Sequence, residues 1–165
     1  MQICEMSDKE SLFLLSSHIE LGYFSKRLIY ERIRPVSEIF EMDFDTLKSR
    51  LKISEKQIKA ILSLKFKIDE LHDEYLSLDE RKIRFILPFE DDYPKKLLNI
   101  TDYPFGIFVK GNIPKSQKSV AIVGSRTASE YGLGMAKFIA RELAQSGVDI
   151  ISGMALGVDT KAHEG

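Results

Sequence analysis

Apolar residues recur at three- and four-residue steps through the first 80 positions of the 165-residue chain, a spacing that predicts short amphipathic helices. The first should begin at the Ser-Asp pair of SDKESLFLLSS, because these side chains accept hydrogen bonds from the first amides of a helix. Gly22, the Arg34-Pro35 step and Met42-Asp43 interrupt the periodic segments. The pattern therefore predicts a small helical module over residues 1–80, with helices of one to four turns.

The longest periodic segment of the module is ISEKQIKAILSLKFKIDELHDEYLSL, with Ser54 as its N-cap. Six positions follow one another there at helical steps: Ile58, Ile61, Leu62, Lys65, Ile68 and Leu71. A stripe with this period is more typical of a core-facing surface than of a ligand site.

From Lys82 onward the sequence pattern changes, and short strand candidates take the place of helical spacing. IRFILP and FGIFVKG are short strand candidates on either side of the short helix predicted from DDYPKKLLNI, and we interpret residues 81–117 as a connecting segment. Residues 118–165 then predict strand, loop, helix, strand, glycine loop and the start of another helix. Strands at 120–123 and 148–151, joined by a helix of about four turns, form a βαβ unit with a parallel sheet and a right-handed crossover.

The fold class that follows is α/β: a helical N-terminal module and then the first part of a parallel α/β domain. Doubly wound sheets usually contain about five or six strands, and two strands cannot bury both faces of a sheet. We therefore expect residues 118–165 to be the start of a truncated domain.

Composition is that of a globular protein, with 44% hydrophobic and 30% charged residues. Neither a signal peptide nor a membrane span is evident, so we expect a cytoplasmic protein without membrane partners. The single cysteine, Cys4, and three scattered histidines favour neither an intrachain disulfide nor a zinc site. The net charge is −1, but residues 1–80 carry 12 basic and 16 acidic side chains whereas residues 81–165 carry 12 and 9. The second half is thus the basic one.

Two glycine loops, GSRTASEYG and SGMALGVD, follow the two predicted strands of residues 118–165. Ligands of parallel sheets collect at this edge, where backbone N–H groups and helix dipoles favour an anion. Arg126 adds a permanent charge and a fork that fits a phosphate. The loops predict a site for a phosphate or a phosphodiester chain. Structural interpretations stay open: Gly124 permits a turn, Ser129 caps the helix, Tyr131 packs on its first turn, and Arg126 pairs with a carboxylate.

Other chemistries fit the loops less well. A dinucleotide site lacks its third glycine, because Lys137 stands there, and it lacks an acidic residue after the second strand. Asp159 and His163 make no metal site, and we expect helix capping from the first and packing from the second. Ser125 lacks the nucleophile-elbow motif. We therefore predict neither an enzyme nor a cofactor, with a nucleotide-binding or nucleotide-processing enzyme on a related Rossmann-like fold as the alternative.

Three motifs in order, DDYPKKLLNITDYPFGIFVKG, VAIVGSRTASEYG and IISGMALGVDTKAHEG, resemble the DNA-processing protein A (DprA/Smf) family over residues 91–165. The resemblance implies a Rossmann-like fold, binding and protection of single-stranded DNA in the cytoplasm, and help in loading the RecA recombinase during natural transformation. It also implies a homodimer for the full-length protein. The helical module resembles the sterile-alpha-motif-like or helix-hairpin-helix-like domain of many members, or else serves as a protein-interaction domain.

The resemblance also implies roles for residues of the two loops. Gly124, Ser125 and Arg126 would meet the DNA backbone, and the second loop would form the neighbouring wall. Leu156 stands where many members carry a basic residue. With nearby polar groups included, the predicted DNA- or phosphate-binding set is Gly124, Ser125, Arg126, Ser129, Ser152, Gly153, Ala155, Gly157 and Lys161.

Overall fold

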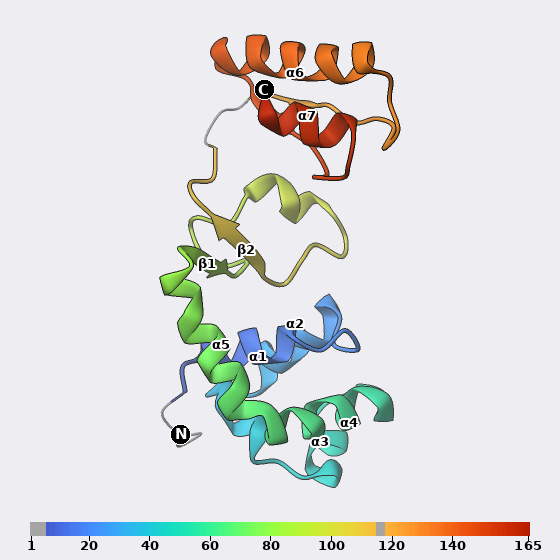
Figure 1. Cartoon of the computed structure of the whole chain (residues 1–165). Helices are drawn as coiled ribbons and strands as arrows, with labels where there is room; N and C mark the ends of the chain where they lie inside the picture. Colours follow the sequence, from blue (N-terminus) through green and yellow to red (C-terminus); the bar gives the residue numbers. More distant parts are fainter. Residues whose placement is uncertain (1–5, 115–117) are drawn as a thin grey trace. The chain divides into compact units, whose positions relative to one another are not determined.

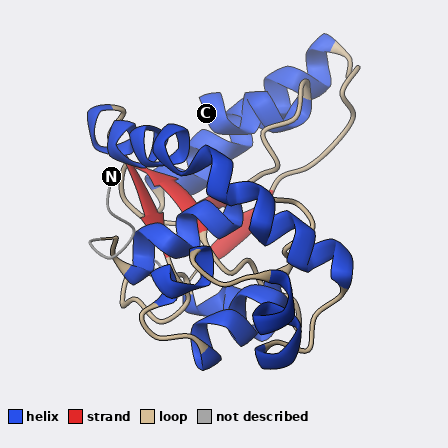
Figure 2. Cartoon of the chain, turned by 90° about the horizontal axis from the view of Figure 1, so that it is seen from below, coloured by secondary structure: helices blue, strands red, loops and turns tan. Residues whose placement is uncertain are grey.

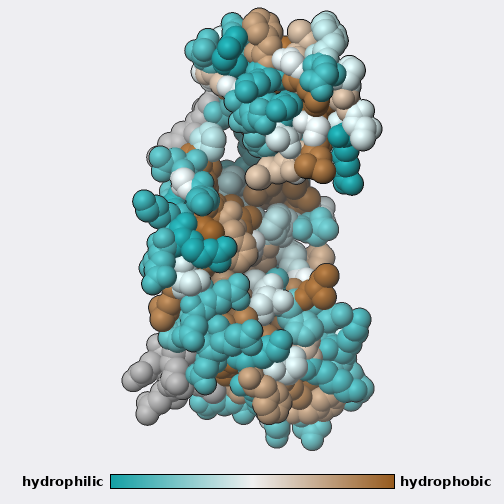
Figure 3. Space-filling view, in the orientation of Figure 1, coloured by the Kyte–Doolittle hydropathy of each residue, from teal (hydrophilic) through white to brown (hydrophobic). Residues whose placement is uncertain are grey.

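The computed structural model of the chain describes residues 6–114 and 118–165, so Cys4 lies outside the described residues. The chain divides into two compact units, residues 1–113 (unit 1) and residues 114–165 (unit 2). Figure 1 traces the elements of each. On the face drawn in Figure 3, hydrophilic residues cover much of the surface, with hydrophobic residues interspersed among them.

Residues 8–80 of unit 1 are mostly helical, as the hydrophobic spacing predicts. Ser7 caps the first helix through a 3.1 Å hydrogen bond from the Glu10 amide, and Asp43 caps a later one through Thr46 N. Gly22 and Pro35 each stand directly before an element. The elements are α1 (Asp8–Ser16), α2 (Tyr23–Arg32), the 3₁₀ helix η2 (Val36–Phe40), α3 (Phe44–Arg50), α4 (Glu55–Leu64), the 3₁₀ turn η3 (Lys65–Lys67) and α5 (Ile68–Glu80).

The longest periodic segment forms two helices, α4 and α5, rather than one. Ser54 caps α4 as predicted, in a capping box with Gln57. The break falls at η3, after which Ile68 opens α5 and is buried like Ile61 on α4. Phe66 at the turn is 92% exposed. Hydrophobic spacing continued across the break, and so the sequence pattern gave no sign of it.

Strands β1 (Ile83–Ile86) and β2 (Ile107–Lys110) are antiparallel, with Ile86 opposite Ile107, and the short helix between them is the 3₁₀ helix η4 (Lys95–Asn99). Phe85 and Phe105 belong to the same buried cluster as the helices. The segment expected to connect two domains is therefore packed, up to residue 113, within unit 1.

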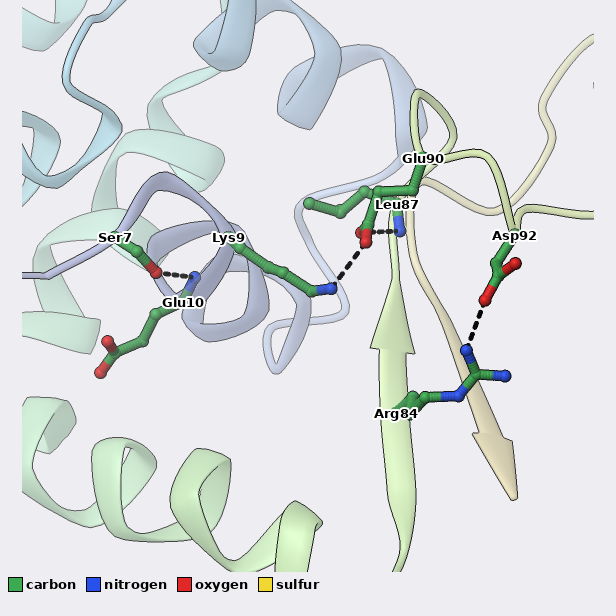
Figure 4. Close-up of polar contacts among 7 residues, drawn as sticks. All are labelled: Ser7, Lys9, Glu10, Arg84, Leu87, Glu90 and Asp92. Carbon is green, nitrogen blue, oxygen red and sulfur yellow. Dashed lines mark hydrogen bonds and ion pairs between the residues drawn. The ribbon is translucent and has the colours of Figure 1, made fainter. Parts of the chain in front are cut away.

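Polar contacts also attach β1 to the helical module (Figure 4). Lys9 of α1 forms a 2.7 Å ion pair with Glu90, whose other carboxylate oxygen accepts a 2.8 Å hydrogen bond from Leu87 N. Arg84 on β1 pairs with Asp92 in the following loop. These bonds join residues up to 81 positions apart in the sequence.

Unit 2 contains β3 (Ser119–Ala121), α6 (Glu130–Gln145), β4 (Asp149–Ile151) and α7 (Val158–Glu164). The predicted parallel pairing is confirmed, with Ala121 opposite Ile151 and a further 3.0 Å bond from Ile122 N to Ile151 O. Helices account for far more of the chain than strands do (Figure 2), and the mixture is compatible with the predicted α/β class. The Rossmann-like form stays a prediction. Among the described residues, no helix has both the length and the apolar character needed to cross a membrane.

Candidate functional site

Both glycine loops of unit 2 leave the carboxyl ends of the paired strands β3 and β4, as the sequence predicts. The loops also contact one another directly. Ser152 Oγ donates a 2.7 Å hydrogen bond to Ile122 O, and Val158 N donates a 3.2 Å bond to Ser125 O. Residues 30 or more positions apart thus form one continuous surface at this edge of the sheet.

Asp159 lies at the centre of that surface and is only 6% exposed. One carboxylate oxygen accepts the N–H of Gly124 at 3.3 Å and the other accepts the N–H of Gly153 at 3.1 Å. The predicted helix-capping role is therefore wrong. Gly157 is the N-cap of α7, and Asp159, in the first turn, joins the two loops instead. The sequence signal was the acidic residue at the end of the second glycine loop, and its hydrogen-bond partners could be identified only from the tertiary structure.

The glycines are explained by close packing between the loops. A Cβ on Gly124 would lie 2.8 Å from the Val158 side chain, and one on Gly153 would lie 2.9 Å from Asp159 Oδ2. Gly157 has φ +86°, and a Cβ there would lie 2.3 Å from Ser125 O. The expectation that backbone N–H groups of the loops face an anion is therefore wrong at Gly124 and Gly153, because both amides already donate to Asp159.

Other donors at the site have no partner within residues 6–114 and 118–165. The backbone N–H groups of Ser125, Arg126 and Ala155 form no hydrogen bond there. The Arg126 side chain is exposed and forms no ion pair with any described residue, so the alternative of a surface carboxylate partner finds no support. A permanent cation and several amides therefore remain available for an anion.

All three predicted serines form hydrogen bonds within unit 2, and those of Ser125 and Ser129 are local. Ser129 Oγ accepts the Gly132 N–H at 3.2 Å and caps α6, which confirms the capping interpretation. Ser125 Oγ accepts the Thr127 N–H at 3.1 Å. Together with the bond from Ser152 Oγ to Ile122 O, these contacts hold the loops in place. Of the three serines, only Ser125 is both exposed and next to Arg126 in the sequence.

Lys161, the second predicted cation, is paired. Its ammonium group lies 2.9 and 2.8 Å from the two carboxylate oxygens of Glu164, which also contacts Lys137 at 3.3 Å. Hydrogen bonds from Lys161 and then Lys137 hold the pKa of Glu164 below its ordinary value. A phosphate would have to compete with Glu164 for Lys161.

The predicted packing of His163 is wrong, and the alternative in which Tyr131 packs on the first turn of its helix finds no support. Tyr131 is 77% exposed, and His163 is exposed with Nε2 3.3 Å from Ser152 O. Met154, at φ +55°, and Leu156 are also largely exposed. Within the described parts of the chain, no three His, Cys, Asp or Glu side chains are grouped as metal ligands.

These features describe a protein of helices and small sheets, compatible with the α/β class, with a candidate anion site between two loops at the carboxyl edge of a parallel strand pair. A family model described as DNA recombination-mediator protein A matches residues 84–165, which include both loops. The chain belongs to this family, the DNA-processing protein A (DprA/Smf) family.

Several curated relatives are similar to the chain. It is 34% identical over 123 residues to protein Smf of Borreliella burgdorferi, covering 68% of this chain and 38% of that protein. Protein Smf of Escherichia coli is 38% identical over 87 residues, covering 52% of this chain and 23% of the relative. The DNA processing protein DprA of Streptococcus pneumoniae is 37% identical over 99 residues, or 59% and 34%. The chain thus spans well under half of the length of these relatives.

Proposed function

We propose that this chain acts in DNA processing and binds single-stranded DNA through the two glycine loops of unit 2. Membership of the family and the chain's similarity to relatives named DNA processing protein DprA support a DNA-processing role. In the full-length protein, the further roles would be those that the family resemblance implies: protection of incoming DNA in the cytoplasm, loading of RecA and a homodimeric state.

The main structural support for this proposal is the environment of Arg126. It is an exposed arginine without an ion-pair partner among the described residues, on a loop that Asp159 holds against its neighbour. A guanidinium in a fixed position can contact a phosphate through two parallel hydrogen bonds. The unbonded amides of Ser125 and Arg126 lie on the same backbone segment and provide further donors for phosphate oxygens.

The hydrogen bonds of the buried Asp159 carboxylate help to divide the predicted DNA- or phosphate-binding residues by role. Gly124, Gly153 and Gly157 would act by allowing the loops to approach, since their Cβ positions are occupied. Ser125, Arg126 and Ala155 would supply the contacts, and Ser129 and Ser152 would hold the loops. Because both oxygens of Asp159 already accept amides, the site also favours binding over an enzyme that uses this carboxylate as a base.

Fluorescence anisotropy with labelled oligo-dT tests the site. Arg126→Ala should weaken binding about tenfold, since a charge-assisted hydrogen bond contributes roughly 1.5–3 kcal/mol. The slope of log affinity against log salt should fall by about 0.7 for one lost phosphate contact. Arg126→Lys keeps the charge but not the fork and should give an intermediate loss.

Arg141→Ala is the matched control, because Arg141 is also exposed and lies eleven residues into α6, about 16 Å along its axis from the first turn. Its binding curve should match that of the unchanged protein. Equal curves for Arg126→Ala and the unchanged protein at both low and high salt would remove Arg126 from the site.

A further inference from the structure

Unit 1 contains a strongly basic surface far in sequence from the glycine loops. Between residues 48 and 67 there is one acidic residue, Glu55, and seven basic ones: Lys48, Arg50, Lys52, Lys56, Lys59, Lys65 and Lys67. The next thirteen residues, which form α5, reverse this balance with six acidic residues and neither lysine nor arginine. The positive charge is thus concentrated on α3, α4 and η3 in a half of the chain that is acidic overall.

One outward face of α4 and η3 carries much of this charge. Lys56 and Lys59 are three residues apart on α4, a spacing that places them on one side of the helix, and Lys67 follows in η3 after α4 has ended. The opposite side is buried through Ile58, Ile61 and Leu64. Lys59 and Lys67 are exposed and form no ion pair with any residue that the structure describes.

Acidic groups reach only part of this surface. Lys56 pairs with Glu20 at 2.9 Å, and Lys48 pairs with Glu55 at 3.1 Å. Lys65 instead donates to the Met42 carbonyl. The exposed end of the face, from Lys59 to Lys67, therefore keeps its positive charge.

Phe66 lies at that end, between Lys65 and Lys67, and its side chain is 92% exposed. An exposed aromatic ring beside unpaired lysines is the combination that single-stranded nucleic acids need, because a base stacks on the ring while phosphates contact the cations. The positive charge of the lysines would attract any polyanion, whereas stacking on the Phe66 ring favours a polyanion with unpaired bases.

We infer that the α4–η3 face, defined by Lys56, Lys59, Phe66 and Lys67, is a second binding surface for single-stranded nucleic acid. It does not depend on the glycine loops. Phosphates contact Lys59 and Lys67, and one base stacks on Phe66.

The chain contains no tryptophan, and so Phe66→Trp would introduce a single tryptophan, whose emission can be excited selectively, at the proposed stacking position. Oligo-dT should quench its emission in a saturable way, and Lys59→Gln with Lys67→Gln should weaken that binding about tenfold. The paired control, Lys95→Gln with Lys110→Gln, removes two exposed lysines elsewhere in unit 1 and should leave the titration unchanged. Phe24→Trp, at a ring that is 65% exposed on α2, should show no saturable quenching.

In the fluorescence titration, the absence of quenching at Phe66→Trp, or equal quenching at Phe24→Trp, would overturn the inference. Tighter binding of polyglutamate or of phosphatidylglycerol vesicles than of oligo-dT at equal salt would also overturn it, in favour of an acidic protein or a membrane. Adding Arg126→Ala separates the two proposals. Quenching that persists in this background supports the α4–η3 face whatever the anisotropy assay shows for the loops.

Discussion

The two units of this chain differ most in how they bury apolar side chains. In unit 1, Leu12, Ile29 and Phe40 come from different elements and are at most 1% exposed. Among the described residues of unit 2, the buried apolar ones are three alanines, Ala136, Ala140 and Ala162, and larger apolar side chains remain at the surface. The exposed ones on or beside its strands and on α6 are Val120, Val123, Tyr131, Phe138, Ile139 and Ile151.

The difference follows from architecture. The helices of unit 1, together with β1, surround a shared interior. A parallel strand pair needs cover on both faces, and two helices supply little of it. Unit 2 is therefore held to a larger degree by polar contacts in its loops, and the most buried of these belong to Asp159.

The comparison predicts that the same substitution has unequal effects in the two units. Phe40→Ala removes a ring that is 1% exposed and should cost about 3–5 kcal/mol of unfolding free energy. Phe138→Ala removes a ring that is 49% exposed and should cost about 1 kcal/mol, in proportion to the smaller buried area. Urea denaturation combined with amide exchange resolved by unit would measure both. Equal losses would mean that unit 2 has a core like that of unit 1.

Asp159→Ala should be the most damaging polar substitution in unit 2. It leaves two loop amides without an acceptor, and the expected cost is about 2–4 kcal/mol. Amide exchange at Gly124 and Gly153 should accelerate, while unit 1 keeps its protection. Asp159→Asn retains one acceptor oxygen and should cost less. If both glycine amides exchange at unchanged rates in Asp159→Ala, then the carboxylate does not hold the loops.

The contrast between local and long-range contacts also explains what the sequence could predict. Ser7, Ser54 and Ser129 each accept from the amide three positions further on, so their caps could be predicted from neighbouring residues. The strand–helix–strand order of unit 2 could be predicted for the same reason, since each element has its own local sequence pattern. The packing of Phe85 and Phe105 with the helices depends on contacts between distant segments, which no periodicity records.

The candidate site divides in the same way. The loops and Arg126 could be found from glycine spacing after the strands, but the positions of Gly124 and Gly153 relative to Asp159 could not, because these contacts link residues up to 35 positions apart. The exposure of Tyr131 was missed because its surroundings depend on elements other than its own helix.

Helix caps offer a smaller test, in which the two units should respond alike. Ser54→Ala and Ser129→Ala each remove an acceptor of one first-turn amide, at 3.3 and 3.2 Å respectively. Each should cost about 1 kcal/mol, and each loss should appear in amide exchange of its own unit. Replacing either serine with aspartate, which also accepts at this position, should restore the stability. A loss at Ser54 without one at Ser129 would show that α6 depends on other contacts.

The smallest effect concerns Glu164 at the end of unit 2. Lys161 and Lys137 lower its pKa from the ordinary value of 4.5, so the charged form is favoured in the folded state. The pairing therefore stabilises the fold above pH 4.5 and is lost as the pH falls through the lowered pKa. Because Glu164 is solvent-exposed, screening keeps this contribution small.

An NMR titration of the Glu164 carboxyl group measures the effect directly, and Lys161→Met should return its pKa toward 4.5. The same pair limits the proposed DNA contact, since Glu164 occupies the Lys161 ammonium group. Glu164→Gln should therefore raise oligo-dT affinity a few-fold at neutral pH, the range expected for an exposed ion pair. In a Lys161→Met background the gain should shrink to the general effect of one lost negative charge. An unchanged gain in that background would exclude Lys161 from the DNA contact and leave Arg126 as the principal cation of the site.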